Sequence, residues 1–412
     1  MDILSAREAR SHHIQRVMTA FPNKTCVVLK LNMVGPDKNP KAFQWIITYY
    51  HIQLQTQFNS HIIRHSYHES VDGNYFLYIV KRDPKLVKDH MVALEDDSAL
   101  GRLIDIDVYH QHPLTRKRPR QCIICDDLAH HCVRSQAHSV EDVRSIMTSI
   151  MHNALTAYMT HITIESMIEE VNLYPCFGLV SNKDAGCHKD MNSDTFLASI
   201  RALKPFIKAY LEEDDSKKLK AIGLNAEKAM FEATEGINTH KGLIFLLGIF
   251  LPVLKQAIVS GHSIAHFHNN LTTLANSIVG DYYNNLKLPQ TAGDRSYIDY
   301  QTKGVRGIAL DGFDVVLNQP PFNTDYDRLL YFMANIDDTT IIHKTSYETL
   351  KRVKKEIKAL IEQGGYPHNH ARYNALSNTY KKAGISPGGS ADLWVISRLF
   401  ETFKPYLKRE HI

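Results

Sequence analysis

The chain has 412 residues, which is enough to bury a sizeable hydrophobic core and more than one average domain needs, so two domains are the natural expectation. A hydrophobic content of 44% and a charged content of 22% argue against a disordered or fibrous protein. The formal net charge of +4 is too small to demand a nucleic-acid partner, whereas phosphorylated ligands stay open because 23 histidines add anion and metal contacts.

The cysteine content and the amino terminus favour a cytoplasmic protein. Six cysteines are few for this length, and the first residues, MDILSAREARSHH, lack the apolar core of a signal peptide. The longest apolar run, residues 242–254, is about 13 residues long, whereas a membrane span needs roughly 20, and it contains Pro252. We therefore expect reduced thiols, a buried apolar helix and no membrane partner.

Short strand-like and helix-like segments alternate as far as residue 110. TCVVLKLNMVG, residues 25–35, predicts a buried strand, and residues 41–58 place their apolar side chains on one helical face. NYFLYIVK, residues 74–81, and RLIDIDVYH, residues 102–110, predict two further strands.

The hydrophobic periodicity of the sequence changes near residue 148. From Met147 onward the periodicity is helical almost throughout, with one apolar stripe formed by Phe196, Ile200, Leu203, Phe206, Ile207 and Tyr210. We predict an α+β unit over residues 1–148 and an all-α helical unit over residues 149–412. The junction, SVEDVRSI, has no Pro/Gly-rich linker, which favours a continuous helix there.

The segment GRLIDIDVYH, residues 101–110, carries the first chemical feature. Alternate side chains of a strand share a face, so its apolar residues would pack inward while Asp105 and Asp107 project together on the other side. Two carboxylates at this spacing can hold Mg²⁺, which can bridge phosphate oxygens and stabilise a leaving pyrophosphate. The pattern is typical of nucleotidyltransferase sites, although a solvated strand face has the same pattern.

A basic, cysteine-containing segment follows at residues 114–138, LTRKRPRQCIICDDLAHHCVRSQAH. A cluster of cations could bind the di- or triphosphate of a substrate, or could simply be solvated: Arg116, Lys117, Arg118 and Arg120. Arg134 and His138 add donors. Cys122, Cys125 and Cys132 with a nearby histidine invite a zinc interpretation. Because the C-x2-C-x6-C-x5-H spacing is not one of the common zinc patterns, we expect buried, reduced cysteines instead of zinc.

These segments resemble the holo-citrate lyase synthases, also called apo-citrate lyase phosphoribosyl-dephospho-CoA transferases, over most of residues 10–145. VVLKLNMVGPDKNP, GRLIDIDVYH and CIICDDLAHHCVRSQAH carry the resemblance. Such enzymes attach a dephospho-CoA-derived group to a serine of the citrate lyase acyl carrier protein (gamma) subunit and release pyrophosphate. The resemblance implies Mg²⁺ carboxylates at Asp105 and Asp107, and phosphate contacts at Arg102, Arg134 and His138. VDGNYFLYIV, residues 71–80, departs from the family pattern.

Four polar islands each adjoin a helix in the second half: GCHKDMNSDTF, GINTHKG, TKGVRGIALDGF and SPGGSADLW. Free amides and the helix dipole favour an anion at a helix start, although any one island could be a cap or a turn. Together they predict a polyphosphate site with these contacts: His188, Lys189, His240, Lys241, Lys303 and Arg306.

The same islands, with EVNLYPCFGLV, resemble the triphosphoribosyl-dephospho-CoA synthases from about residue 150 to the end. In that family 3'-dephospho-CoA attacks the ribose of ATP at its anomeric carbon and expels adenine. The product is the precursor that the first family transfers. The two resemblances together imply a bifunctional transferase that uses ATP, 3'-dephospho-CoA and Mg²⁺.

Expelling adenine builds oxocarbenium-like charge, so the site needs a carboxylate, a base for the incoming hydroxyl, and cations with Mg²⁺ for the triphosphate. Asp190 and Asp392 are the candidate catalytic carboxylates, and Asp190 is also the candidate Mg²⁺ ligand. Asp337 and Asp338 are further candidates. The sequence does not identify the base.

Three departures from the synthase pattern bear on activity. Ser181 and Ile308 replace carboxylates that relatives carry, and residues 343–346 replace an Arg-Gly-Gly. If the missing carboxylates held Mg²⁺, Asp190 or Asp392 would have to suffice, or the activity of this half would fall.

Two other functions fit parts of the sequence. The equivalent malonate decarboxylase enzymes use the same prosthetic group with another carrier protein, and a zinc-stabilised module on a helical scaffold would bind nucleic acid. We expect the bifunctional transferase, with the carrier protein and small nucleotides as partners and no nucleic acid.

Overall fold

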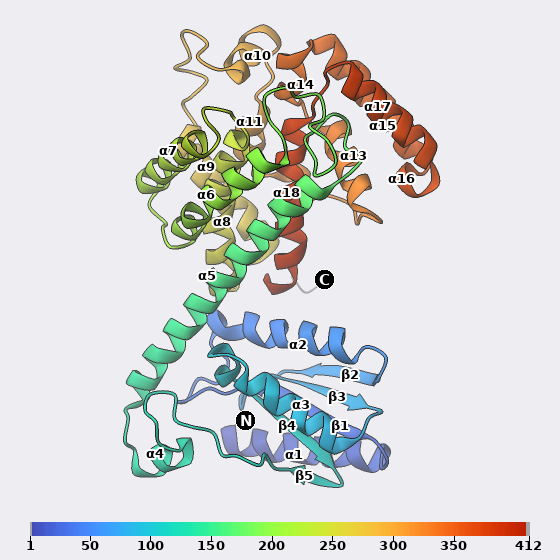
Figure 1. Cartoon of the computed structure of the whole chain (residues 1–412). Helices are drawn as coiled ribbons and strands as arrows, with labels where there is room; N and C mark the ends of the chain where they lie inside the picture. Colours follow the sequence, from blue (N-terminus) through green and yellow to red (C-terminus); the bar gives the residue numbers. More distant parts are fainter. Residues whose placement is uncertain (1, 409–412) are drawn as a thin grey trace. The chain divides into compact units, whose positions relative to one another are not determined.

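The computed structural model describes residues 2–408 and divides them into two compact units. The first unit ends at Leu155 and also includes Ile258–Gly261, and the second comprises Thr156–Ala257 and the residues from His262 onward. A β-sheet with helices forms the amino-terminal part of the chain, and helices follow in the carboxy-terminal part (Figure 1).

The first unit is built on a five-stranded antiparallel sheet with the strand order β2-β3-β1-β4-β5. Its strands are β1 (Thr25–Leu31), β2 (Ile62–His68), β3 (Tyr75–Val80), β4 (Ile104–His110) and β5 (His112–Leu114). The helices that pack against it are α1 (Ile3–Ala20), α2 (Gln44–Phe58) and α3 (Pro84–Asp96), and short 3-10 turns span Lys41–Phe43 and Leu100–Leu103.

Alternation along β1 and β4 decides which side chains share a face. Ile14 of α1 packs with Cys26 and Val28 of β1 in one buried cluster. Lys30 pairs with Asp105 across the two strands, and Val28 pairs with Asp107, so both aspartates share the α1 face of the sheet. The predicted arrangement of this strand is confirmed, because the three apolar residues of β4 are buried on the opposite face.

Side chains form hydrogen bonds with the backbone groups of β4 that lie beyond its pairing with β5. Glu95 accepts a hydrogen bond from the Ile106 amide at 2.6 Å, and Lys88 donates to the Ile106 carbonyl at 3.3 Å. Arg120 donates to the Ile104 carbonyl at 3.0 Å. These contacts satisfy backbone groups that would otherwise stay open at a sheet edge.

The connection between the two units is helical. After the short helix α4 (Ala129–Ser135), α5 (Val140–Asn172) runs without a break through the expected junction, as its lack of proline and glycine predicted. In the second unit the α5 residues Met159, Thr163 and Met167 form a fully buried stripe at a spacing of four.

The second unit consists of helices around a core formed largely by α8 and α18. Its helices are α6 (Ser193–Leu211), α7 (Ser216–Ala233), α8 (Lys241–Ser260), α9 (Ile264–Val279), α10 (Ala292–Tyr300), α11 (Gly304–Leu310), α12 (Asp314–Leu317), α13 (Asp325–Asn335), α14 (Thr339–Lys344), α15 (Tyr347–Glu362), α16 (Gly365–His368), α17 (His370–Lys382) and α18 (Gly388–Phe403), followed by a 3-10 turn at Lys404–Tyr406. The predicted stripe of α6 is confirmed, since Ile200, Leu203, Ile207 and Tyr210 are buried.

The apolar helix α8 is longer than the sequence indicated. It passes through Pro252 and ends at Ser260, and Lys255 fixes its second half by donating to Thr156 Oγ1 and the Leu211 carbonyl at 2.8 and 2.9 Å. It is long and apolar enough to cross a bilayer, but 72% of its apolar window is buried inside the protein, as in a core helix.

Candidate functional site

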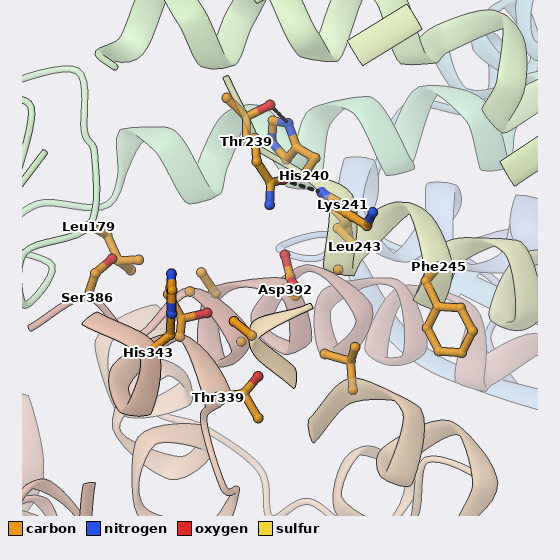
Figure 2. Close-up of a pocket in the computed structure, with 18 of the residues that line it drawn as sticks. Leu179, Thr239, His240, Lys241, Leu243, Phe245, Thr339, His343, Ser386 and Asp392 are labelled. Carbon is orange, nitrogen blue, oxygen red and sulfur yellow. Dashed lines mark hydrogen bonds between the residues drawn. The ribbon is translucent and has the colours of Figure 1, made fainter. Parts of the chain in front are cut away.

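The second unit contains a cavity of about 620 Å³, a volume typical of small-molecule sites. In Figure 2 His240 and Lys241, at the start of α8, lie above Asp392 of α18, and His343 and Ser386 lie to one side of them. Six residues predicted from the sequence line this cavity: His188, Asp190, His240, Lys241, Arg306 and Asp392.

Two other predicted phosphate contacts lie elsewhere. Lys189 is exposed beside the cavity and does not line it. Lys303 lines a separate hollow of about 370 Å³ together with Asp311 and Asp314. The structure therefore brings the polar islands together but turns these two lysines away from the cavity.

Besides the exposed Asp190, two carboxylates removed from solvent face the cavity without polar partners, Glu170 from α5 and Asp392 from α18. Neither has a hydrogen-bond or ion-pair partner among the described residues. Burial raises the pKa of Glu170 to about 8. Burial, and then the carboxylates of Asp338 and Glu170, raise the pKa of Asp392 well above its ordinary value. A site that keeps two acids in this state is suited to bind a cation or to accept a proton.

Close backbone approach positions Asp392. Its Oδ2 lies against Gly242, where any Cβ atom would overlap with it. The glycine at the start of α8 is therefore required for the carboxylate to reach the cavity from α18.

Sequence reasoning missed Glu170, although a signal was present. Glu170 is 7% exposed and continues the buried stripe of Met159, Thr163 and Met167 on α5. A charged side chain on the apolar stripe of a helix is rare unless it is paired or functional, and that position alone would have indicated it.

His240 is a buried, neutral group. Its Nδ1 lies 2.7 Å from Ser199 Oγ and 3.2 Å from Thr239 Oγ1, and its ring meets Phe196 edge to face at 5.0 Å. Burial lowers the pKa of His240 to about 3. It can therefore offer a hydrogen bond to a ligand at neutral pH, but not a positive charge.

Three cations line the cavity, each held by a neighbour. Lys241 Nζ lies 2.9 Å from Glu227 Oε2. Arg306 pairs with the buried Asp294 at 3.1 Å and stacks on Tyr282 with 4.0 Å to the ring centroid.

The third cation is Lys344, at the end of α14, whose segment departs from the family pattern. Its Nζ lies 3.1 Å from Nδ1 of His188, and Nε2 of His188 lies 3.1 Å from Ser386 Oγ. Burial, and then the charge of Lys344, lower the pKa of His188 to about 4. His188 is therefore neutral, and Lys344 is the cavity cation without a carboxylate partner among the described residues.

Asp337 and Asp338 are engaged in other contacts. Asp338 accepts hydrogen bonds from the amides of Gly389 and Ser390 at 3.3 and 2.9 Å and from Ser390 Oγ at 2.9 Å. Asp337 pairs with Lys354 at 2.8 Å. The first amides of α18 are thus occupied by Asp338.

The two replaced carboxylates of the synthase pattern lie outside the cavity. Ser181 is buried in a turn, where its Oγ accepts hydrogen bonds from the Lys183 and Asp184 amides at 3.3 and 3.2 Å. Ile308 lines the separate hollow beside Lys303. Neither substitution removes a group from the wall of the cavity.

A second polar site lies on the α1 face of the sheet in the first unit. Asp105 pairs with Lys30 at 3.3 Å and with Arg120 at 3.4 Å. Burial, and then the neighbouring charge of Asp105, raise the pKa of Asp107. Oxygen donors so placed fit a hard divalent cation, whose charge would compensate both carboxylates.

The basic segment after β5 is largely neutralised by carboxylates. Arg116 makes two contacts of 2.8 Å with Asp96, and Arg120 pairs with Glu95. Lys117 pairs with Asp89 at 3.4 Å. These side chains hold the segment against α3 and β4 in the described structure.

The remaining predicted contacts of the first unit are dispersed. Arg102 donates to the Gln121 carbonyl. Arg134 is exposed on α4, and His138 Nε2 lies 3.3 Å from Cys125 Sγ.

Comparison with known families gives two adjoining matches. Residues 1–154 match the family of apo-citrate lyase phosphoribosyl-dephospho-CoA transferases, CitX. Residues 156–410 match the family of ATP:dephospho-CoA triphosphoribosyl transferases, CitG.

Curated relatives match over nearly the whole chain. Protein CitXG of Leuconostoc mesenteroides subsp. cremoris is 30% identical, covering 96% of this chain and 95% of the relative. Protein CitXG of Haemophilus influenzae is 28% identical, covering 98% and 96%. The 2-(5''-triphosphoribosyl)-3'-dephosphocoenzyme-A synthase of Haemophilus ducreyi is 30% identical over 67% of this chain and 98% of its own length.

Proposed function

The chain belongs to the CitXG family, and from this premise we propose that the cavity of the second unit is its synthase site and the Asp105 face of the first unit its transferase site. The protein is a bifunctional enzyme with triphosphoribosyl-dephospho-CoA synthase and apo-citrate lyase phosphoribosyl-dephospho-CoA transferase activities. The family assignment favours this enzyme over a nucleic-acid-binding module.

The observation that carries the synthase proposal is that one cavity is lined both by two buried carboxylates without polar partners and by three cations. The triphosphate of ATP needs positive charge, and Lys241, Arg306 and Lys344 supply it. The start of α8 adds a helix dipole oriented to favour an anion. His240 and His188 are neutral and would contribute hydrogen bonds only.

Glu170 and Asp392 fit Mg²⁺, since both are oxygen donors without partners, and a cation would offset the cost of ionising them inside the protein. Bound there, Mg²⁺ would supply charge neutralisation for the triphosphate. Asp190 would then serve as the base, because it lines the cavity from the loop before α6 and is exposed.

In the synthase step the attacking hydroxyl oxygen of 3'-dephospho-CoA forms a bond to the anomeric carbon of ATP, and the bond from that carbon to adenine breaks. Asp190 takes the hydroxyl proton, and the departing adenine takes up a proton from solvent. A cavity carboxylate that is ionised in the complex would stabilise the positive charge that develops on the sugar.

In the transferase step the oxygen of the carrier serine would form a bond to the phosphorus next to the ribose, the bond from that phosphorus to pyrophosphate would break, and the serine proton would pass to solvent. As in a nucleotidyltransferase-like unit, Asp105 and Asp107 would hold Mg²⁺, which would supply charge neutralisation for the phosphates. Lys30 and Arg120, which pair with Asp105, are placed to contact the phosphates as well. The protein partner is the citrate lyase acyl carrier protein, for which we propose the gamma subunit. We also propose a cytoplasmic location, where ATP and the carrier protein are available.

The experiment is to incubate the protein with ATP, Mg²⁺ and 3'-dephospho-CoA and to measure free adenine and the triphosphoribosyl adduct by mass spectrometry, before and after adding carrier protein. Lys241→Ala should weaken adenine release. Asp105→Asn should leave adenine release intact and stop attachment to the carrier. Loss of adenine release in a folded Asp105→Asn variant would overturn the assignment of the two sites.

A further inference from the structure

Three cysteines and a histidine of the first unit form a compact cluster outside both proposed sites. The ligand atoms of Cys122, Cys125, Cys132 and His138 all lie within 4.8 Å of one another, and residues 2–408 contain no second cluster of this kind. Cys125 Sγ lies 3.5 Å from Cys132 Sγ and 3.3 Å from His138 Nε2.

The two separations are close to those in the first coordination sphere of zinc, and the three cysteines are not joined in disulfides. A disulfide has its sulfurs about 2.05 Å apart. Four ligands in tetrahedral positions, with Zn–S of about 2.3 Å and Zn–N of about 2.05 Å, stand about 3.8 Å apart for two sulfurs and about 3.6 Å for sulfur and nitrogen. The two separations from Cys125 Sγ are slightly shorter than this, and all four ligand atoms lie within 4.8 Å of one another, so one ion would need only small shifts of the side chains.

The local backbone brings the four side chains together. The Cys122 amide donates to the Asp127 carbonyl at 2.7 Å and closes a tight loop, in which the Ile124 amide points at Cys122 Sγ at 3.4 Å. The helix α4 carries Cys132, and the Ala137 amide donates to the Cys132 carbonyl at 3.1 Å to return the chain at His138. The unusual spacing of the ligands thus follows from a helix placed between the second and fourth ligands.

The segment has almost no hydrophobic core to hold this shape. Cys132 is the one buried residue between positions 111 and 140, and Val133 of α4 is 73% exposed. Small segments that cannot bury apolar surface need a cross-link such as a metal ion.

We propose that Cys122, Cys125, Cys132 and His138 bind one structural Zn²⁺. Three thiolates and one neutral imidazole favour zinc over the hard cations Mg²⁺ and Ca²⁺, and four protein ligands leave no position for a substrate. Binding displaces the thiol protons into solvent. His138, which the sequence analysis placed among the phosphate contacts, is a metal ligand in this proposal.

If the proposed transferase site is correct, the segment that carries the four ligands, residues 122–138, also helps to position a cation of that site. Arg120 stands two residues before Cys122, donates to the Ile104 carbonyl at 3.0 Å and reaches Asp105 at 3.4 Å. Arg102 donates to the Gln121 carbonyl beside it. Loss of zinc would free the chain from Cys122 onward, so Arg120 would keep its contacts with Glu95 and Ile104 but would be less firmly positioned over Asp105.

The test begins with elemental analysis of the full chain purified under reducing conditions from zinc-supplemented cells, with about one zinc per chain expected. Replacing the zinc by Co²⁺ should give thiolate-to-cobalt charge-transfer absorption and the visible bands of a tetrahedral ion. Cys125→Ser and His138→Gln should lose the metal. Cys187→Ser and His130→Gln remove a thiol and an imidazole outside the cluster and should keep it.

The variant His138→Cys distinguishes loss of a metal ligand from loss of the fold, because a site of four cysteines also binds zinc. His138→Cys should therefore retain zinc where His138→Gln does not. A purified chain with neither zinc nor cobalt absorption after reconstitution would overturn the proposal, as would full zinc content in Cys125→Ser. Attachment to the carrier protein should fall at least about 10-fold in His138→Gln and recover in His138→Cys. Unchanged attachment in His138→Gln would overturn the positioning of Arg120.

Discussion

Replacing Glu170 by glutamine should make the protein more stable while stopping the release of adenine. Burial raises the pKa of Glu170 from 4.5 to about 8. In the pH window between these values the folded protein keeps a proton that the unfolded chain has released. The contribution of this group to the free energy of unfolding therefore decreases as pH rises through that window and is constant above it.

The size of the effect follows from the two pKa values. Each unit of difference corresponds to about 1.4 kcal/mol, so the cost approaches about 5 kcal/mol above pH 8 and is about 3 kcal/mol at pH 7. Glutamine has nearly the same volume and cannot ionise. Protonated glutamate and glutamine are both polar and unpaired at this position, so their desolvation costs largely cancel.

The assay is thermal unfolding from pH 4 to pH 9 without divalent metal, alongside adenine release. At pH 7 the variant should melt roughly 6 to 12 °C above the wild type, and the difference should vanish near pH 4. Mg²⁺ with ATP should raise the melting temperature of the wild type and much less that of the variant. Adenine release should fall at least about 100-fold.

The neighbouring Glu169 provides a matched control. Glu169 is exposed and pairs with Arg398, so Glu169→Gln should show neither the pH-dependent stabilisation nor the loss of adenine release. If the melting difference between Glu170→Gln and wild type stayed constant from pH 4 to pH 9, the burial argument for this carboxylate would be refuted.

Three further changes probe the cavity and its surroundings. Gly242→Ala should displace the carboxylate of Asp392 and lower adenine release at least about 100-fold with little change in melting temperature, and an active variant would contradict the close-approach argument. Lys344→Met should raise the pKa of His188 from about 4 toward its ordinary value, followed by NMR, and raise the KM for ATP about 10-fold; an unmoved His188 titration would count against the contact. Ser181→Asp should leave adenine release within about 2-fold of wild type, because aspartate can accept the same turn hydrogen bonds, and a large gain in rate would show that this position serves the chemistry.

Local patterns predicted much of the first unit and the helical character of the second. The alternation in β4 placed Asp105 and Asp107 on one face, and the stripe of α6 fixed its buried side, because strand and helix periods follow from the backbone alone. The unbroken helix α5 followed from the absence of proline and glycine in the junction.

The burial and the ion pairing of the site residues depend on partners from other parts of the sequence. The sequence gives no sign that Ser199 and Phe196 enclose His240, or that Glu227 and Asp294 pair with the cavity cations. The cysteine spacing predicted no metal, whereas the fold gathers four ligand atoms.

The sequence by itself determined the two families, the periods of the helices and strands, and most of the residues that meet in the cavity. The tertiary structure alone decided that Glu170 faces Asp392, and that both lack partners. The reason is physical: the ionisation of a side chain depends on the water and the charges around it, and helices far apart in the chain set both.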